Sequence, residues 1–127
     1  MSNAVALIIE DNTDNIEMYG ILMHIEKYSV SSVQDGEQAL DWLNTNDAPA
    51  ILLLDINMPR VDGRQVYDYV RNNTKFSDTR IIIITANSYM AKSMSSILHK
   101  RDYLLQKPFK MIDLQKIVRD MRKARQQ

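Results

Sequence analysis

The sequence contains no cysteine, which excludes disulfide bonds and thiolate metal sites and fits a reducing compartment. It has 16 basic and 16 acidic side chains, and this formal net charge of zero gives no reason to expect binding to nucleic acid or to an anionic membrane. No apolar run approaches the roughly 20 residues that span a bilayer, and the first residues show no signal-peptide pattern. We therefore expect a soluble, cytoplasmic protein.

The length of 127 residues suits one domain that buries a real hydrophobic core. There is no internal repeat, low-complexity tract or linker along the chain. Residues 1–4 are compatible with a cloning remnant, so they receive no functional weight. We expect a single domain across residues 1–127, with no output domain.

Short apolar runs alternate with longer segments of helical period, which predicts five strands and five helices. The expected strands cover residues 6–9, 30–33, 51–54, 81–84 and 103–105, and the expected helices cover 14–27, 38–44, a segment around 66–70, 90–98 and a segment around 114–121. The expected core face of the first helix consists of Ile16, Tyr19, Met23 and Ile25. This alternation indicates an α/β fold with right-handed crossovers and a mostly parallel sheet.

Asp55 directly follows the apolar run at 51–54 and lies four residues before Pro59. A carboxylate there would lie at the carboxyl end of a buried strand, where open α/β sheets place their ligands. On local sequence alone, an Asp that starts a turn before Pro59 is an equal alternative. Polar residues follow three other predicted strands: Glu10 and Asp11, Thr85, and Lys107. Their coincidence favours a functional site at one sheet edge.

The three carboxylates of Glu10, Asp11 and Asp55 would disfavour one another's ionisation at that edge. A hard divalent cation relieves such repulsion. Mg²⁺ keeps several of its waters, so it suits a site with one or two direct carboxylates better than Ca²⁺ does. The alternative for Glu10 and Asp11 is a solvated strand end with an Asx turn. The acidic set therefore predicts a Mg²⁺ site.

Thr85 and Lys107 supply what an anion bound beside such a cation requires. A hydroxyl can donate to a phosphoryl oxygen, and an ammonium group can neutralise one as a point charge. Ala86 is small enough to leave a phosphoryl group room. Taken alone, Thr85 is a strand-end residue and Lys107 a surface cation. Together with the acidic set they indicate phosphoryl chemistry.

These residues resemble the receiver domain of two-component response regulators. The resemblance extends without gaps from about Val5 to Met121, and it rests on residues 8–12, 54–59, Asp62, Gly63, 84–86 and 107–109. It implies a flavodoxin-like, doubly wound, five-stranded parallel sheet of order 2-1-3-4-5 with five helices, and a site at its switch point.

The resemblance also implies a role for each site residue. Asp55 would be the phosphoacceptor, taking a phosphoryl group from a phosphohistidine on a sensor histidine kinase or a histidine phosphotransfer protein. Glu10 and Asp11 would bind Mg²⁺, with Asp11 and Asp55 as direct ligands and the main-chain carbonyl of Asn57 as a further one. The implied protein is a signalling module that catalyses only its own phosphoryl transfer and dephosphorylation.

In such domains a residue in the place of Thr85 closes on the aspartyl phosphate and one in the place of Lys107 pairs with it. The bond from Lys107 to Pro108 would be a cis peptide. A downstream effector would bind the face formed by the fourth helix, fifth strand and fifth helix, and neither nucleic acid nor a membrane is expected as a partner.

One position departs from the family. The aromatic residue that usually rotates with the switching Thr lies three positions before the conserved Lys, and here that position is Leu104. Tyr103 is adjacent, but side chains alternate along a strand, so Tyr103 should point to the opposite face. We expect phosphorylation at Asp55, with an output surface that responds differently from the usual one.

Two other classes of function remain as alternatives. A phosphohydrolase of the haloacid dehalogenase type also uses an Asp nucleophile with Mg²⁺, but it needs a second Asp two positions later as general acid. Asn57 occupies that position and cannot supply an acidic proton. The other alternative, an interaction domain that keeps the fold without phosphorylation, draws its support from Leu104.

Overall fold

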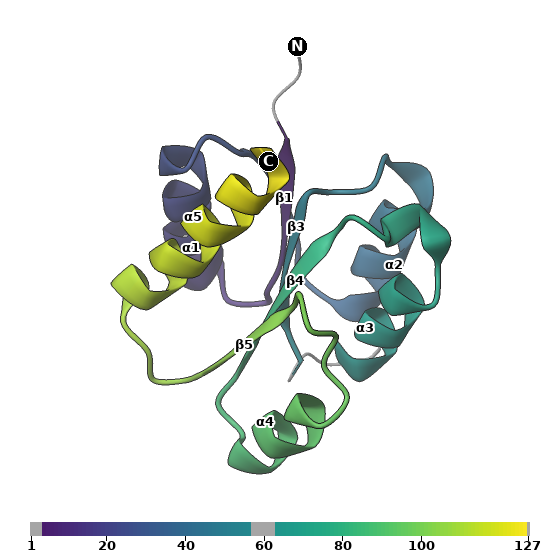
Figure 1. Ribbon diagram of the computed structural model, residues 1–127, viewed down its shortest axis with the longest axis vertical. Coiled ribbons are helices and arrows are strands. Elements are labelled where there is room, and N and C mark those ends of the chain that lie inside the picture. Colours follow the sequence, from purple (N-terminus) through teal and green to yellow (C-terminus); the bar gives the residue numbers. More distant parts are fainter. Residues whose placement is uncertain (1–3, 57–62, 127) are drawn as a thin grey trace.

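The computed structural model describes residues 4–56 and 63–126. Five parallel strands form one sheet in the order β2-β1-β3-β4-β5 (Figure 1). The strands are β1 (Val5–Ile9), β2 (Ser29–Val33), β3 (Ile51–Asp55), β4 (Arg80–Thr85) and β5 (Tyr103–Gln106). The helices are α1 (Thr13–Ile25), α2 (Gly36–Thr45), α3 (Gly63–Arg71), α4 (Ser88–Ser95) and α5 (Met111–Gln126), with a 3-10 turn, η1, at Thr74–Phe76. The flavodoxin-like fold expected from the sequence is confirmed.

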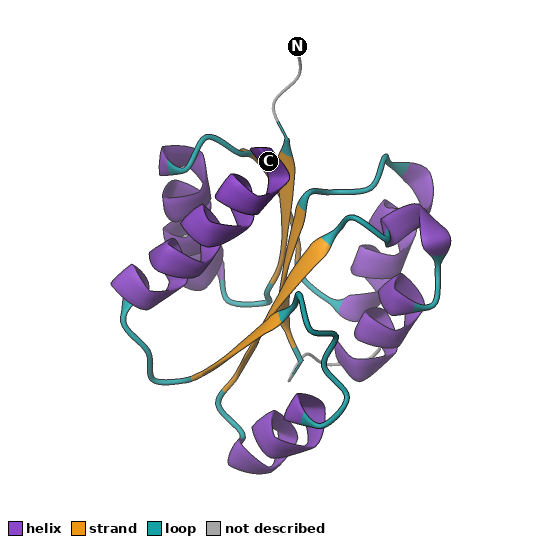
Figure 2. Cartoon of the chain, viewed as in Figure 1, coloured by secondary structure: helices purple, strands orange, loops and turns teal. Residues whose placement is uncertain are grey.

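Helices cover both faces of the sheet, α1 and α5 on one and α2 and α3 on the other (Figures 1 and 2). The strand residues alternate between two separate cores. In β3, Leu52 and Leu54 pack on the α2–α3 side, while Ile51 and Leu53 pack on the α1–α5 side. All four are buried, so β3 carries a continuous apolar run rather than an alternating one.

The register of the central strands brings their carboxyl ends to one edge. Leu54 lies opposite Ile9 of β1, and Asp55 lies opposite Ile84 of β4. Thr85 in turn pairs with Gln106 of β5. Residues that directly follow these strands are therefore neighbours in space, although they lie far apart in the sequence.

Helix α1 ends two residues earlier than expected, and Lys27 causes this. Its φ of 75° is a left-handed conformation, which stops the helix. The Lys27 amide donates to the His24 carbonyl and the Tyr28 amide to the Met23 carbonyl, both at 3.0 Å, as in a Schellman motif. The assignment of Ile25 to the core face of this helix is wrong, because Ile25 is 56% exposed.

A buried polar network ties α3 to the start of β5. The fully buried Asp102 carboxylate accepts hydrogen bonds from the Tyr67 hydroxyl at 3.0 Å, from two Arg71 nitrogens at 2.8 Å and from the Ile81 amide at 3.0 Å. The Tyr67 hydroxyl also accepts from the His99 amide at 2.9 Å. These bonds fasten the segment between α4 and β5 to α3, on the side of the sheet that carries Leu104.

A second network joins α1 to α5. Glu26 is 2% exposed and follows the last residue of α1. Its carboxylate accepts hydrogen bonds from Gln115 at 3.0 Å and Arg119 at 3.1 Å, and its main-chain carbonyl accepts from Arg122 at 2.9 Å. Burial acts to raise the pKa of Glu26, but these hydrogen bonds and the two arginine charges outweigh it and lower that pKa.

We predict that Glu26→Gln lowers the free energy of unfolding near neutral pH by about 1–2 kcal/mol. The substitution removes the negative charge that forms ion pairs with the partly exposed Arg119 and Arg122. The folded-state pKa lies below the ordinary 4.5, so this stabilisation is fully present above about pH 4.5 and is lost as the pH falls through the folded-state value. Urea unfolding at several pH values should show the two proteins converging in acid. A constant difference down to pH 3 would contradict this, and Asp120→Asn, at an exposed position of α5, is the matched control.

Candidate functional site

Asp55 is the last residue of β3, and its side chain is only 12% exposed. The Lys107 ammonium lies 3.4 Å from Asp55 Oδ2. The main chain brings it there, because the Lys107 amide donates to the Thr85 carbonyl at 2.8 Å just beyond the end of β5. The bond between Lys107 and Pro108 is cis, as expected from the sequence. Asp55, Thr85 and Lys107 thus meet at one edge of the sheet.

Glu10, directly after β1, is a buried carboxylate beside Asp55. Its Oε1 accepts hydrogen bonds from the Asn12 amide and the Asn15 side chain, both at 3.3 Å. Burial raises the pKa of Glu10 to about 7, and the hydrogen bond and negative charge of Asp55 add to this rise, while Asn15 and Lys107 oppose it. The site therefore holds more negative charge than its surroundings stabilise.

The negative charges of Glu10 and Asp55 also affect Tyr19. Burial, followed by the charges of Glu10 and Asp55, raises the pKa of Tyr19 to about 12. Tyr19 lies in α1 and is 3% exposed. Of the three carboxylates that the sequence predicts to crowd together, the structure brings Glu10 and Asp55 side by side.

The donor set of this site fits Mg²⁺ by its chemistry. Glu10 and Asp55 present hard carboxylate oxygens, and Asp11 is exposed in the short link between β1 and α1. A divalent cation would offset the burial and the negative charge of Asp55 that together raise the pKa of Glu10. Within residues 4–56 and 63–126, however, no three acidic or histidine side chains are already grouped as a metal site. The expected main-chain ligand Asn57 lies outside the described residues.

Thr85 is the last residue of β4 and is fully buried. Its hydroxyl oxygen accepts a hydrogen bond from the Asn87 amide at 3.1 Å. Asn87 caps α4 through its side chain, which accepts from the Met90 amide at 3.0 Å. Gln106 donates to the Ser88 hydroxyl at 2.7 Å. Thr85 is thus joined to the start of α4, a link that the capping pattern at Asn87 could have suggested but that the sequence reasoning missed.

Of the three switch candidates Thr85, Tyr103 and Leu104, the last two lie on opposite faces of β5. Leu104 packs against the core beneath α2, α3 and α4, in register with Ile83. Tyr103 is in register with Ile82, which belongs to the other core, and it is 39% exposed. Tyr103 therefore occupies a different place from Leu104 and does not replace it, as strand alternation predicts.

Comparison with known proteins agrees with this geometry. Residues 6–119 match the family model described as the response regulator receiver domain. This chain belongs to that family. The response regulator MprA of Mycolicibacterium vanbaalenii is 32% identical over 108 residues, which make up 85% of this chain and 46% of the relative. The chain thus spans about half the length of the curated relatives it matches.

Solved structures show the same fold. The receiver domain of the sensor histidine kinase PA1611 from Pseudomonas aeruginosa is 26% identical, with a TM-score of 0.78 over 94% of this chain and 98% of that one, and it has a magnesium ion coordinated in its active-site cleft. A CheY-like receiver domain from Methylobacillus flagellatus is 21% identical, with a TM-score of 0.80 over 94% of this chain and 99% of that one. The present chain is thus a receiver domain of two-component signalling, in a family of signalling modules.

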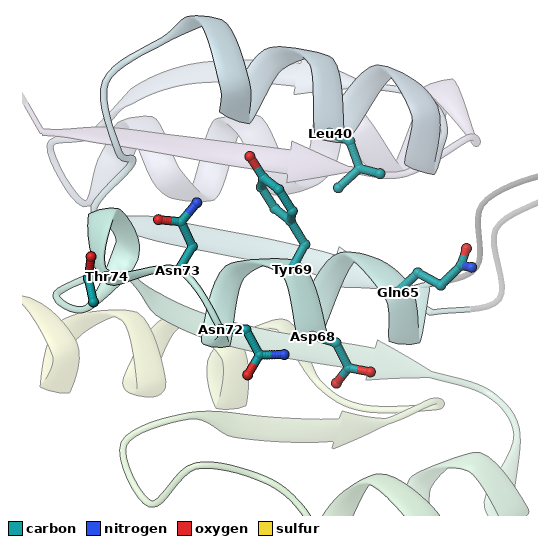
Figure 3. A pocket seen from close by; sticks show the side chains of 7 residues that line it. All are labelled: Leu40, Gln65, Asp68, Tyr69, Asn72, Asn73 and Thr74. Carbon is teal, nitrogen blue, oxygen red and sulfur yellow. The ribbon is translucent and has the colours of Figure 1, made fainter.

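An open groove of about 780 Å³ lies away from this site, between α2 and α3 (Figure 3). It is lined by Leu40, Gln65, Asp68, Tyr69, Asn72, Asn73 and Thr74. Its one lining carboxylate, Asp68, is bonded to Arg64 at 3.2 Å. None of the described strand-end residues lines this groove.

Among the described helices, none is long and apolar enough to cross a membrane.

Gly63 lets α3 begin directly against the residue after Asp55. A Cβ at position 63 would lie 2.6 Å from Ile56 Cβ and closer still to Ile56 Cα, which is backbone and cannot give way. Ile56 is 3% exposed and packs into the core next to the site. Close packing at Gly63 thus helps to hold the end of β3 in place.

We predict that Gly63→Ala lowers the free energy of unfolding by about 2 kcal/mol or more, because the new methyl group collides with main-chain atoms. Gly20→Ala is the matched control, since its Cβ would meet Val30 at 3.7 Å, an ordinary contact. That change should instead stabilise α1 by about 0.5–1 kcal/mol, the usual gain from Gly to Ala within a helix. Urea unfolding measures both, and equal effects would refute the proposed collision.

Proposed function

We propose that Asp55 is the phosphoacceptor of this receiver domain, and that it takes a phosphoryl group from a phosphohistidine on a sensor histidine kinase or a histidine phosphotransfer protein. The observation that carries the proposal is the 3.4 Å contact between the Lys107 ammonium and the mostly buried Asp55 carboxylate. An ammonium group at that distance can later bind a phosphoryl oxygen on the same carboxylate.

In the proposed reaction an Asp55 carboxylate oxygen attacks phosphorus. A P–O bond to Asp55 forms as the P–N bond to the donor imidazole breaks, and the imidazole leaves with the bonding electron pair. Lys107 stabilises charge on the phosphoryl oxygens. The Thr85 hydroxyl, at the end of the adjacent strand, donates a hydrogen bond to one of those oxygens.

Glu10, Asp11, Asp55 and the Asn57 main-chain carbonyl are the proposed ligands of Mg²⁺. When bound, the cation would neutralise developing charge on the phosphoryl group. The pKa of about 7 for Glu10 supports this assignment, because a carboxylate that is buried and lies beside Asp55 is stabilised in its charged form by a nearby cation. The magnesium in the PA1611 receiver domain is a further reason to expect it here.

We predict that incubation with acetyl phosphate and Mg²⁺ adds one phosphoryl group, detected by intact-mass measurement. Asp55→Asn should abolish the adduct because an amide oxygen is a poor nucleophile, and Lys107→Ala should slow its formation by about a hundredfold. Asp68→Asn, in the exposed pair with Arg64, is the control and should leave labelling unchanged.

An adduct that survives Asp55→Asn would overturn the proposed acceptor. Absence of any adduct on the folded wild-type protein would instead favour an interaction domain that keeps the fold without phosphorylation. Chelation of Mg²⁺ should stop labelling, and labelling that persists in chelator would remove the metal from the proposal.

We propose further that phosphorylation draws Thr85 toward Asp55 and is transmitted to an effector through the face of α4, β5 and α5. The Thr85 hydroxyl already binds the amide of Asn87, the residue that caps α4, so movement of Thr85 would pull on the start of that helix. Leu104 has no ring to rotate, and Tyr103 lies on the other face of β5. The response should therefore concentrate at the start of α4 and be weak along β5.

Backbone NMR of the beryllofluoride complex against the metal-free protein tests this prediction. The expected large shifts lie in the loops around Asp55 and Thr85 and in the first turn of α4, with small shifts along β5, because no aromatic side chain links that strand to the site. Large shifts at Tyr103 and through β5 would show that the strand still responds. Shifts confined to the loops around Asp55 would show that α4 does not.

A further inference from the structure

Asn15, in the first turn of α1, reaches back with its side chain to the Glu10 carboxylate. Its amide nitrogen Nδ2 donates to Glu10 Oε1 at 3.3 Å, and the Asn12 main-chain amide donates to the same oxygen at 3.3 Å. Glu10 is 2% exposed, so its carboxylate depends on protein donors for most of its hydrogen bonds. One oxygen of this buried carboxylate is therefore held by two donors from the start of α1.

The backbone of Asn15 is fixed independently of that contact. Asn12 is the N-cap of α1, and its side-chain oxygen accepts a hydrogen bond from the Asn15 main-chain amide at 2.9 Å. The Asn12 carbonyl accepts from the Ile16 amide at 3.0 Å. Asn15 is the third residue of the helix, and helical side chains are tilted toward the amino end. The helix thus directs the Asn15 side chain back toward Glu10.

The start of α1 is a modified capping box. In the usual form, a Glu or Gln at the third helix position accepts the main-chain N–H of the N-cap residue. Here the carboxylate that accepts the Asn12 N–H belongs to Glu10, which precedes the helix, and Asn15 at the third position donates to that carboxylate instead. The contacts that begin the helix therefore also orient Glu10.

The side chain of Asn15 carries no charge, which suits a residue beside a cation site. A lysine or arginine at this position would repel a divalent cation. A glutamate, which is common at the third position of a capping box, would add a further carboxylate to Glu10, Asp11 and Asp55. An amide donor fixes the direction of the Glu10 carboxylate without either effect.

We propose that Asn15 is a positioning residue for magnesium, which holds Glu10 in the orientation that the cation or one of its waters requires. The inference deepens the magnesium site of the proposed function and rests on it. Mg²⁺ demands near-octahedral geometry and retains several waters, so a poorly oriented ligand costs affinity. Groups that orient a metal ligand typically contribute about tenfold to a hundredfold to metal affinity.

Titration of the unphosphorylated chain with Mg²⁺, followed by NMR through the backbone amide signals around Glu10 and Asp55, measures the dissociation constant. Asn15→Leu keeps the approximate size of the side chain but removes the donor, and it should raise the dissociation constant for Mg²⁺ about tenfold. Asn44→Leu, at an exposed position of α2, is the matched control and should leave that constant unchanged. Circular dichroism melts should show that both variants remain folded.

Two further measurements separate positioning of Glu10 from a general loss of structure. Ca²⁺ accepts irregular coordination, so Asn15→Leu should raise the dissociation constant for Ca²⁺ by less than about threefold. Asn15→Gln keeps an amide donor and places Gln where a capping box favours it, so this variant should bind Mg²⁺ within about threefold of the wild-type protein.

Failure of the inference and failure of the magnesium site give different results. A wild-type protein that does not bind Mg²⁺ would overturn the magnesium site, and the inference with it. Wild-type binding that Asn15→Leu leaves intact, an equal loss of Mg²⁺ and Ca²⁺ affinity, or an Asn15→Gln variant as weak as Asn15→Leu would overturn the inference alone. A selective loss of Mg²⁺ affinity in Asn15→Leu that is recovered in Asn15→Gln is the expected result.

Discussion

The parallel pairing of β3 with both β1 and β4 is the constraint on which the rest of this receiver domain depends. Because β3 is covered on both faces, its side chains have no solvated side, and a shift of register by one residue would exchange the two cores. The register fixes Asp55 opposite Ile84 and places Glu10 and Thr85 at the same edge. The burial of aliphatic side chains is non-directional, but through this register it determines where Glu10, Asp55 and Thr85 lie.

That placement creates an electrostatic cost. Burial raises the pKa of Glu10 to about 7, the neighbouring Asp55 carboxylate adds to this rise, and Asn15 and Lys107 offset it only in part. Unfavourable electrostatics of this kind are common at functional sites. The well-packed sheet stabilises the fold enough to offset their cost. The buried bonds around Asp102 and Glu26 lie far along the chain from Asp55, and they hold the outer helices and the segment between α4 and β5 in place.

The helices on the two faces of the sheet form different surfaces (Figure 1). On one side the buried Thr85 is linked through Asn87 to α4, so a change at the site has a direct route to the α4 surface. Leu104 fills its place in the core without an aromatic ring. On the other side α1 and α5 form an apolar groove.

The order of apolar runs and the polar residues that follow them were enough to predict the strands, the parallel sheet and the meeting of Asp55, Glu10, Thr85 and Lys107, because parallel strands must end at one edge. Local patterns could not settle where α1 ends, because the left-handed Lys27 depends on the turn it enters. Nor could they separate Ile25 from the core residues of the same helix. Helical spacing shows that residues share a face, but only the packed neighbours decide whether that face is buried, and only the tertiary structure brought the exposed Ile21 and Ile25 of α1 into one groove with Ile112 of α5.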